Sequence, residues 1–333
     1  MSNSVTINEF DRKILYELNK NGRQSISNIA QKIGKGVDYV IYRIKRLKEL
    51  GIYIGDVVVM DISKLGFQTH SLYLQVVNQH KVPELIDYLK NKPEVVDIIK
   101  VVGKYQLYTV IHVKKINQLE EVISNLGEHF SDVIINYRLL LCYNGYSLAH
   151  NYLFKNKEPI LHDKLRYHEK EINLSDKEMK FISVLLKDPR ASFHKIAKEI
   201  DSTLPKVRQI YEDLIKKEVI YYIRPSLNSL PLGYLHKHVL IRLKFGGMKK
   251  LKEIKSHLLG MKEIKALTLT FGRYDLTGRF IFESLADFQQ FQEDFYSKFG
   301  KYVHSLHADD YFEEIDYAPQ KAIDLLVKER EGE

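Results

Sequence analysis

The sequence of 333 residues predicts an α+β fold that is built twice in tandem. The first observation is an internal repeat: residues 14–50 and 181–217, which lie 167 positions apart, share nine identities in 37 positions, where average residue usage would give about two. The second is the order of patterns, because in each half a helical period of apolar residues precedes short β-branched runs. A chain of this length also exceeds the usual size of one hydrophobic core.

Each repeat is predicted to form three helices and then a strand. In the first copy, helices are expected at 8–21, from Ser25 as N-cap to the glycines at 34–36, and at 37–50. Strands are expected at 54–62 and 219–227. Two short helices that meet across a tight turn and lead into a strand are typical of a winged helix-turn-helix. A three-helix packing module without a ligand is the alternative.

Downstream of each helical region, the pattern predicts the order βαββαβ. Strands are expected at 70–78, 95–102, 105–114 and 133–143 and helices at 81–91 and 117–130, and in the second half strands near 236–245, 263–271, 273–282 and 302–312 and helices near 248–259 and 285–298. This is the ferredoxin-like order, whose open sheet face or edge is a natural place for dimerisation.

The predicted architecture is therefore two winged helix-turn-helix domains alternating with two ferredoxin-like βαββαβ domains. We expect the first winged helix at residues 1–62 and the first βαββαβ domain at 63–150. Residues 151–173 are charged, contain Pro159 and lack a clear period, which predicts a linker. The second winged helix is expected at 174–228, the second βαββαβ domain at 229–317 and an acidic tail at 318–333.

The composition predicts an ordinary globular protein, with 44% apolar and 28% charged residues. No apolar run approaches the roughly 20 residues that cross a bilayer. The N-terminal residues MSNSVTINEF lack the features of a signal peptide, so we expect a cytoplasmic protein without membrane contact. The single cysteine, Cys142, lies in an apolar strand-like run and is expected to be a buried, unreactive thiol.

The net charge of +8 is unevenly distributed and favours a polyanionic partner. Residues 1–50 hold ten Lys and Arg against five Asp and Glu, and residues 201–250 hold ten against four. Residues 301–333 hold four against nine. Two basic regions therefore stand apart from an acidic C-terminal end.

Three segments carry a family likeness. FDRKILYELNKNGR at 10–23 and RIKRLKELGIYIGDVVVMD at 43–61 resemble the helix-turn-helix half of the Lrp/AsnC (feast/famine) transcription regulators, and VVGKYQLYTVIHV at 101–113 resembles their ligand-sensing domain. In the second half, LTFGRYDLTGRF at 269–280 resembles the family's Gly-x-Tyr-Asp loop, whereas LSDKEMKFISVLLKDPR at 174–190 departs in detail. Members normally carry one copy and pair as dimers, so the resemblance implies an intramolecular pseudo-dimer that is likewise expected to associate further.

The resemblance implies a recognition helix at residues 36–48 that enters the major groove of double-stranded DNA. It places Asp38, Tyr39, Tyr42, Arg43 and Arg46 against DNA, with Asp38 favoured as a helix cap. In the second copy two arginines are replaced by Ile210 and Asp213, while Lys206, Arg208 and Gln209 remain available. We therefore expect unequal readers and an asymmetric site. A solvated helix face is the alternative for each charged residue.

The resemblance also implies an amino-acid effector site at the turn between the second and third strands of each βαββαβ domain. The matching positions are Gly103, Tyr105 and Gln106 in the first copy and Gly272, Tyr274 and Asp275 in the second. Because a carboxylate is the stronger acceptor for an ammonium group, the second site is favoured. The alternative is that these residues serve a tight turn.

Two other function classes remain open. The sirohaem decarboxylases share this architecture and need His and Arg groups around a carboxylated tetrapyrrole; candidates here are His112, His236, His238, His304 and His307, but no paired His/Arg cluster is evident. An architectural chromatin protein with little sequence preference is the other. No Walker loop, dinucleotide fingerprint, zinc spacing or nucleophile elbow is present, so we expect a non-enzymatic protein without cofactor or metal.

Overall fold

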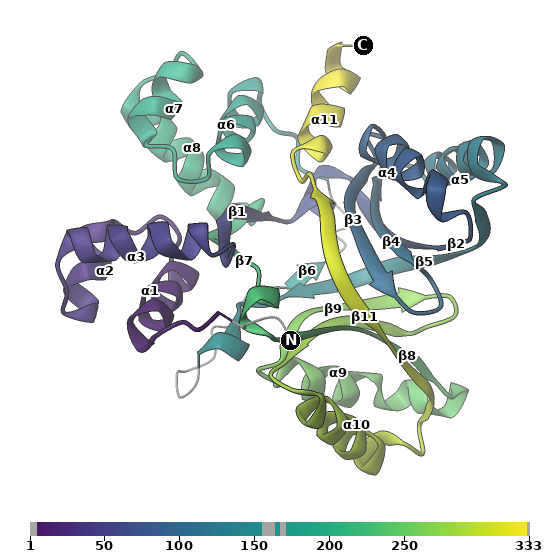
Figure 1. The fold of residues 1–333 in the computed structure, drawn as a ribbon. Coiled ribbons are helices and arrows are strands. Elements are labelled where there is room, and N and C mark those ends of the chain that lie inside the picture. Colours follow the sequence, from purple (N-terminus) through teal and green to yellow (C-terminus); the bar gives the residue numbers. More distant parts are fainter. Residues whose placement is uncertain (1–4, 155–163, 167–170, 332–333) are drawn as a thin grey trace.

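The computed structural model describes residues 5–154, 164–166 and 171–331, and it confirms the predicted α+β class (Figure 1). Each half begins with three helices and a strand and continues in the order βαββαβ. The two three-helix units lie on one side of the molecule, and the βαββαβ segments lie on the other. None of the described helices is long and apolar enough to cross a membrane.

The first head consists of α1 (Glu9–Lys20), α2 (Ile26–Ile33) and α3 (Val37–Glu49), and the second head of α6 (Asp176–Lys187), α7 (Phe193–Glu199) and α8 (Leu204–Lys216). Ser25 caps α2 as predicted, because its side chain accepts a hydrogen bond from the Asn28 amide. The equivalent Ser192 caps α7. The repeated apolar residues form the two cores: Leu18, Ile29, Val40 and Leu47 are buried in the first, and Leu185, Ile196, Val207 and Leu214 in the second.

A two-stranded ribbon joins the heads to the rest of the molecule. Strands β1 (Tyr53–Met60) and β7 (Ile220–Leu227) follow the two heads and pair with each other in antiparallel register, with Val57 opposite Arg224. The sequence predicted both strands but not their pairing, because hydrogen bonds between segments over 160 residues apart leave no local pattern.

The two βαββαβ segments together form one closed sheet. The first contributes β2 (Gln68–Val76), β3 (Val95–Val102), β4 (Leu107–Val113) and β5 (Ile134–Ser147), and the second β8 (Leu235–Leu243), β9 (Ile264–Phe271), β10 (Leu276–Phe282) and β11 (Val303–Tyr317). Within each half the order is β5-β2-β4-β3 or β9-β10-β8-β11. The long strands β11 and β5 then cross to the other half, where β11 pairs with β3 and β5 with β9. These pairings close the described strands into a barrel.

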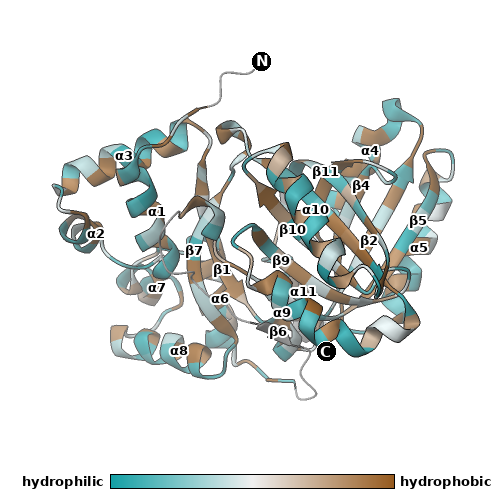
Figure 2. Cartoon of the chain, turned by 90° about the horizontal axis from the view of Figure 1, so that it is seen from below, coloured by the Kyte–Doolittle hydropathy of each residue, from teal (hydrophilic) through white to brown (hydrophobic). Residues whose placement is uncertain are grey.

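Helices cover the outside of this barrel and aromatic side chains fill part of its inside. Helices α4 (Val82–Lys90) and α5 (Asn117–Phe130) pack on the first half, and α9 (Leu251–Leu259) and α10 (Leu285–Phe299) on the second. Figure 2 shows hydrophobic residues concentrated in the strands and hydrophilic residues on outer faces of the helices. Inside the barrel lie Tyr73, Tyr105, Tyr108 and Tyr274. Cys142 is also buried, which confirms that part of the prediction, and this burial raises the pKa of its thiol to about 11.

The predicted linker and tail contain structure of their own. Residues Asn151–Leu153 form a 3-10 turn, and Leu153 is buried in the first head, where its carbonyl accepts a hydrogen bond from Arg12 at 2.7 Å. Lys164–Arg166 form the short strand β6, which pairs with β5. The rest of the linker, 155–163 and 167–170, lies outside the described residues.

The predicted acidic tail contains α11 (Lys321–Glu331). Ala322 and Ile323 are buried in the core of the second head. The Lys321 ammonium donates to the carbonyls of Lys90, Lys92 and Val95 at 2.7–3.1 Å, beyond the C-terminal end of α4. The tail therefore fastens the second head to the barrel. The sequence prediction rested on the net charge of these residues. The packing of the tail on the second head depends instead on the spacing of its apolar residues.

Candidate nucleic-acid interface and central cavity

Helix α3 presents a polar face to solvent. It begins at Val37 with Gly36 as its N-cap, after Gly34 has turned the chain in a left-handed conformation with φ of 67°. Asp38, Tyr42 and Arg46 are spaced four residues apart, so they lie on one side of the helix, and all three are exposed. Asp38 makes no cap hydrogen bond, which corrects the predicted capping role: it sits within the first turn, where the helix dipole favours a carboxylate.

Arg43 departs from the predicted DNA contact because it points into the first head. Its residue is 7% exposed, and its guanidinium donates two hydrogen bonds to the Asp11 carboxylate, one from Nε at 2.7 Å and one from Nη2. The hydrogen bond to Asp11 raises the pKa of Arg43. Position 43 lies about 100° around the helix from Tyr42, which turns it from the solvent face to the inner face. Arg43 therefore ties α3 to α1.

Tyr39 is half-buried and also partly committed to the head. Its ring meets Phe10 edge to face at 5.8 Å, and the Lys35 ammonium lies 4.5 Å from the centre of the Phe10 ring.

Helix α8 presents a different set of side chains. Lys206, Arg208 and Gln209 are exposed, whereas Ile210 is buried. Glu178 of α6 stands at the position equivalent to Asp11 of α1. Its carboxylate pairs with the Lys217 ammonium at 2.6 Å, whereas Asp11 pairs with an arginine of the third helix. Both heads thus neutralise a buried acid, but only the first uses a residue of the third helix.

The two heads touch each other through a reciprocal arginine contact. Arg23 donates to the carbonyls of Pro189 and Ala191 at 2.9 and 2.7 Å, and Arg190 donates to the carbonyl of Gln24 at 2.9 Å. The Arg23 guanidinium also lies 4.7 Å from the centre of the Phe193 ring. Arg23 and Arg190 stand at equivalent positions of the repeat, 167 residues apart, and sequence reasoning gave them no role. The available signal was a repeated arginine among identities that are mostly apolar.

The residues at the predicted effector positions make contacts within the protein, mainly to neighbouring strands. Gln106 accepts a hydrogen bond from the Val76 amide at 2.9 Å, and Asp275 accepts one from the Leu243 amide at 2.7 Å. Tyr105 and Tyr274 are buried inside the barrel. Gly272 has a φ of 133°, and a side chain at Gly103 would collide with the Asp309 carboxylate. These contacts match the tight-turn alternative.

The structure brings histidine and arginine together where the sequence indicated no cluster. Arg279 of β10 stands opposite His238 of β8, and His238 shares a hydrogen bond with the Tyr73 hydroxyl at 2.8 Å. Burial lowers the pKa of His238, His112 and His236 to about 3 each, so these imidazoles are neutral at ordinary pH. His304 and His307 are exposed; His307 lies opposite Leu240, two residues along β8 from His238, and its ring meets Tyr274. No group of three potential metal ligands occurs among the described residues.

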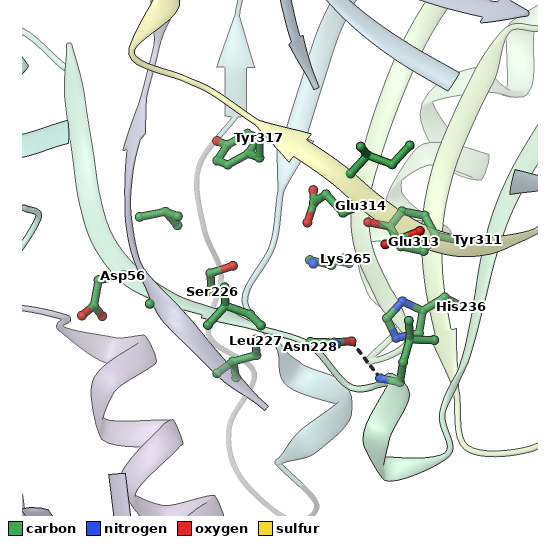
Figure 3. A pocket seen from close by; sticks show the side chains of 15 residues that line it. Asp56, Ser226, Leu227, Asn228, His236, Lys265, Tyr311, Glu313, Glu314 and Tyr317 are labelled. Carbon is green, nitrogen blue, oxygen red and sulfur yellow. Dashed lines mark hydrogen bonds between the residues drawn. The ribbon is translucent and has the colours of Figure 1, made fainter. Parts of the chain in front are cut away.

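A cavity of about 590 Å³ lies between the ribbon and the barrel (Figure 3). Asp56, Ser226 and Asn228 line it from the ribbon side, and Lys265, His236, Tyr311, Glu314 and Tyr317 from the barrel side. A second cavity shares Ser226, Lys265, Glu314 and Tyr317 with the first and continues toward Arg224, Arg279, His112 and His238. The two cavities therefore adjoin at Lys265.

The chain resembles known DNA-binding regulators in sequence. Residues 7–52 match the family model described as winged helix-turn-helix DNA-binding. The transcriptional regulator Ptr1 of Methanocaldococcus jannaschii is 30% identical over 118 residues, which are 35% of this chain and 80% of that protein. The transcriptional regulator FL11 of Pyrococcus horikoshii is 25% identical over 123 residues, 37% of this chain and 82% of that protein.

The chain belongs to the Lrp/AsnC family of HTH-type transcription regulators. Its relatives are transcription regulators, which supports a non-enzymatic role for this Lrp/AsnC protein. The crystal structure of the siroheme decarboxylase NirDL has the same overall fold, with a TM-score of 0.60 and 17% identity over 98% of this chain and 99% of that one. At 17% identity, this likeness shows a shared tandem fold and does not extend to the activity.

Proposed function

We propose that this Lrp/AsnC regulator binds a specific DNA sequence as an intramolecular pseudo-dimer, in which one chain supplies both heads. The observation that carries the proposal is the exposed face of α3, where Asp38, Tyr42 and Arg46 lie in one line. Arginine suits guanine edges and phosphates, and tyrosine can donate to phosphate. The head contact through Arg23 and Arg190 supports a fixed distance between α3 and α8.

The two heads are proposed to read DNA unequally. Position 46 of α3 is arginine and its counterpart on α8 is Asp213, which a phosphate would repel. Lys206, Arg208 and Gln209 lie near the start of α8, where phosphate contacts are expected. The site is therefore expected to be asymmetric, with most base contacts in one half.

Selection of bound fragments from genomic DNA tests this proposal directly. We expect a recurring motif with one well-defined half and one degenerate half. In band shifts on that motif at fixed salt, Arg46→Ala combined with Tyr42→Ala should weaken binding by at least tenfold more than Lys206→Ala combined with Arg208→Ala. Equal losses would contradict the asymmetry. Equal affinity for the motif and for random duplex across salt would instead favour an architectural protein.

Further association of chains and an amino-acid effector complete the proposal. Val102 of β3 and Phe312 of β11 are exposed apolar side chains on paired strands, which favours contact between chains at this surface of the barrel. Light scattering of the wild type and Phe312→Ser measures this association.

An amino acid at the Asp275 turn would have to use the remaining carboxylate oxygen beside the one bound to Leu243. Calorimetry with the common amino acids tests that site.

The whole-chain likeness to NirDL favours one second candidate, which is a tetrapyrrole-binding protein. The histidines and Arg279 that line the inner cavity support it. Absorbance near the Soret region after addition of an iron tetrapyrrole separates the two. We expect no shift that depends on His238, whereas a stoichiometric shift abolished by His238→Ala would favour the second candidate.

A further inference from the structure

The second half of the barrel carries a large apolar side chain that none of the described residues covers. Phe245 lies in the turn at 244–250, directly after β8, and is 98% exposed. The turn is anchored, because the Lys244 amide donates to the Tyr302 carbonyl at 2.8 Å and a side chain at Gly247 would collide with that same carbonyl. A partner that covers Phe245 would gain the free energy of burying an aromatic ring.

The surroundings of the Phe245 turn are strongly basic. Residues 242–252 hold five Lys and Arg and no Asp or Glu. Lys244, Lys249 and Lys252 are exposed, and one further lysine of the turn is paired with Glu253 at 2.6 Å. A complementary partner surface therefore offers an apolar recess that acidic side chains border.

The first half of the barrel has such a recess, the groove between α5 and β5. It has a volume of about 230 Å³ and is lined mainly by apolar residues of β2, α5 and β5. Ile135 and Tyr137 of its lining are exposed. Gly127 also lines it, and a Cβ at this position would have open space around it among the described residues. Because α5 has no side chain at Gly127, the groove is open on its helix side.

Acidic side chains border this groove. Residues 117–132, which comprise α5 and the turn after it, hold four Asp and Glu and no Lys or Arg. Glu120 lies two helical turns before Gly127 on the same face of α5, and Glu128 follows Gly127 directly; both carboxylates are exposed. Only Asp132 of the four is paired with a lysine in the described chain. The charge of the groove is therefore opposite to that of the Phe245 turn.

The second half of the chain lacks an open groove at the equivalent place. Helices α5 and α10 both end on a buried phenylalanine, Phe130 and Phe299, and three residues earlier α10 has Tyr296 where α5 has Gly127. The Tyr296 hydroxyl accepts a hydrogen bond from the Leu306 amide of β11 at 3.2 Å. This side chain therefore spans from α10 to β11, where the first half leaves the groove open.

Conversely, the first half lacks the exposed ring. Two residues after β8 the chain has Phe245, whereas two residues after β2 it has Asn78. The ring and the groove thus belong to different halves, and α5 and α9 lie on separate parts of the barrel surface in Figure 1. Complementary patches on different faces of one chain meet between chains.

We propose that Phe245 of one chain docks into the groove between α5 and β5 of a second copy of this chain. The contact is heterologous, because a surface of the second half meets a surface of the first half, so it repeats from chain to chain. It is separate from the barrel surface of Val102 and Phe312. It goes beyond the proposed function, because it gives the association a direction and does not rest on DNA binding.

Analytical ultracentrifugation of the full chain without DNA tests the contact, with Phe312→Ser as the reference protein so that the other surface does not contribute. We expect this reference to form larger species as its concentration rises, and added Phe245→Ser to weaken the association at least tenfold. Added Gly127→Tyr should weaken it as much, because it fills the groove as Tyr296 does in the second half, and replacing a helical glycine does not lower helix stability. The matched control Leu285→Ser removes another exposed apolar side chain of the second half and should leave the association unchanged.

Mixing the two variants identifies the two partners of the contact. The Phe245→Ser chain keeps the groove and the Gly127→Tyr chain keeps the ring, so the mixture should form a one-to-one pair, whereas each variant alone stays single. A reference protein that stays single up to its solubility limit would overturn the proposal. Association that either variant leaves unchanged, or a mixture that forms no pair, would also overturn it. None of these results bears on DNA binding, which the band shifts measure separately.

Discussion

At the scale of single residues, burial separates two arginines that stand three positions apart on α3. Arg46 is exposed and available to DNA, whereas Arg43 is bound to Asp11 inside the head. Position 43 lies at the boundary between the apolar and the polar face of the helix. The sequence alone therefore could not decide whether the Arg43 side chain points into the head or toward solvent. The role of its partner Asp11 was equally open in the sequence, because Asp11 also accepts a hydrogen bond from the Asn8 amide in the capping box of α1.

Replacing Arg43 with alanine should therefore destabilise the protein more than it affects base contacts. Removing one partner of a buried ion pair leaves the other charged and unpaired, which typically costs roughly 3 to 5 kcal/mol. We expect a loss of that size in the free energy of unfolding of the first head, measured by urea denaturation. Arg46→Ala, the matched control, should leave stability within about 0.5 kcal/mol and reduce DNA affinity. Comparable stability of the two variants would contradict the buried role of Arg43.

At the scale of elements, local patterns predicted what each segment forms but not what it touches. The expected strands at 95–102 and 263–271 differ from β3 and β9 by at most one residue at each end. The same patterns gave no sign that β1 pairs with β7 or that β5 and β11 cross between halves. Helix α11 was missed for a related reason, since its apolar residues have a surface to cover only once the second head is in place.

The head contact provides a second test, because it fixes the distance between α3 and α8. Replacing Arg23 and Arg190 with alanine removes three hydrogen bonds between the heads. We expect the double variant to accept a wider range of half-site spacings in a selection from spaced DNA libraries. Affinity for the best-defined half-site should stay within about threefold, since neither arginine lies on the exposed face of α3.

The control for this experiment is another pair of repeated residues. Lys20 and Lys187 are the same residue in both copies, are exposed and carry the same charge. The double variant Lys20→Ala and Lys187→Ala should retain the wild-type spacing preference. If both double variants relax the spacing equally, the effect comes from lost charge and not from the head contact.

At the scale of the whole molecule, closing the sheet into a barrel places polar residues where the sequence indicated an ordinary strand face. His70, His112, His236 and His238 belong to β2, β4 and β8; the barrel buries His70 and His238 and leaves His112 and His236 half-buried. Strand alternation predicts which residues share a face, but an inner face becomes buried only when both halves join. The cluster of His238 and Arg279 therefore depended on tertiary structure, and so did the cavity at Lys265.

This burial predicts that the protein is sensitive to acid. The pKa of His70 falls to about 4 and those of the other three to about 3, whereas an unfolded histidine titrates near 6.5. Below pH 6.5 the unfolded chain therefore binds more protons than the folded one, and stability is lost as the pH falls. Each histidine contributes up to about 1.4 kcal/mol per pH unit over this window. Replacing His112 and His238 with glutamine should flatten the fall in unfolding free energy between pH 6.5 and pH 4, measured by urea denaturation at each pH. The exposed His304→Gln should keep the wild-type slope. An unchanged slope in the double variant would mean that carboxylates, and not the buried imidazoles, govern the acid response.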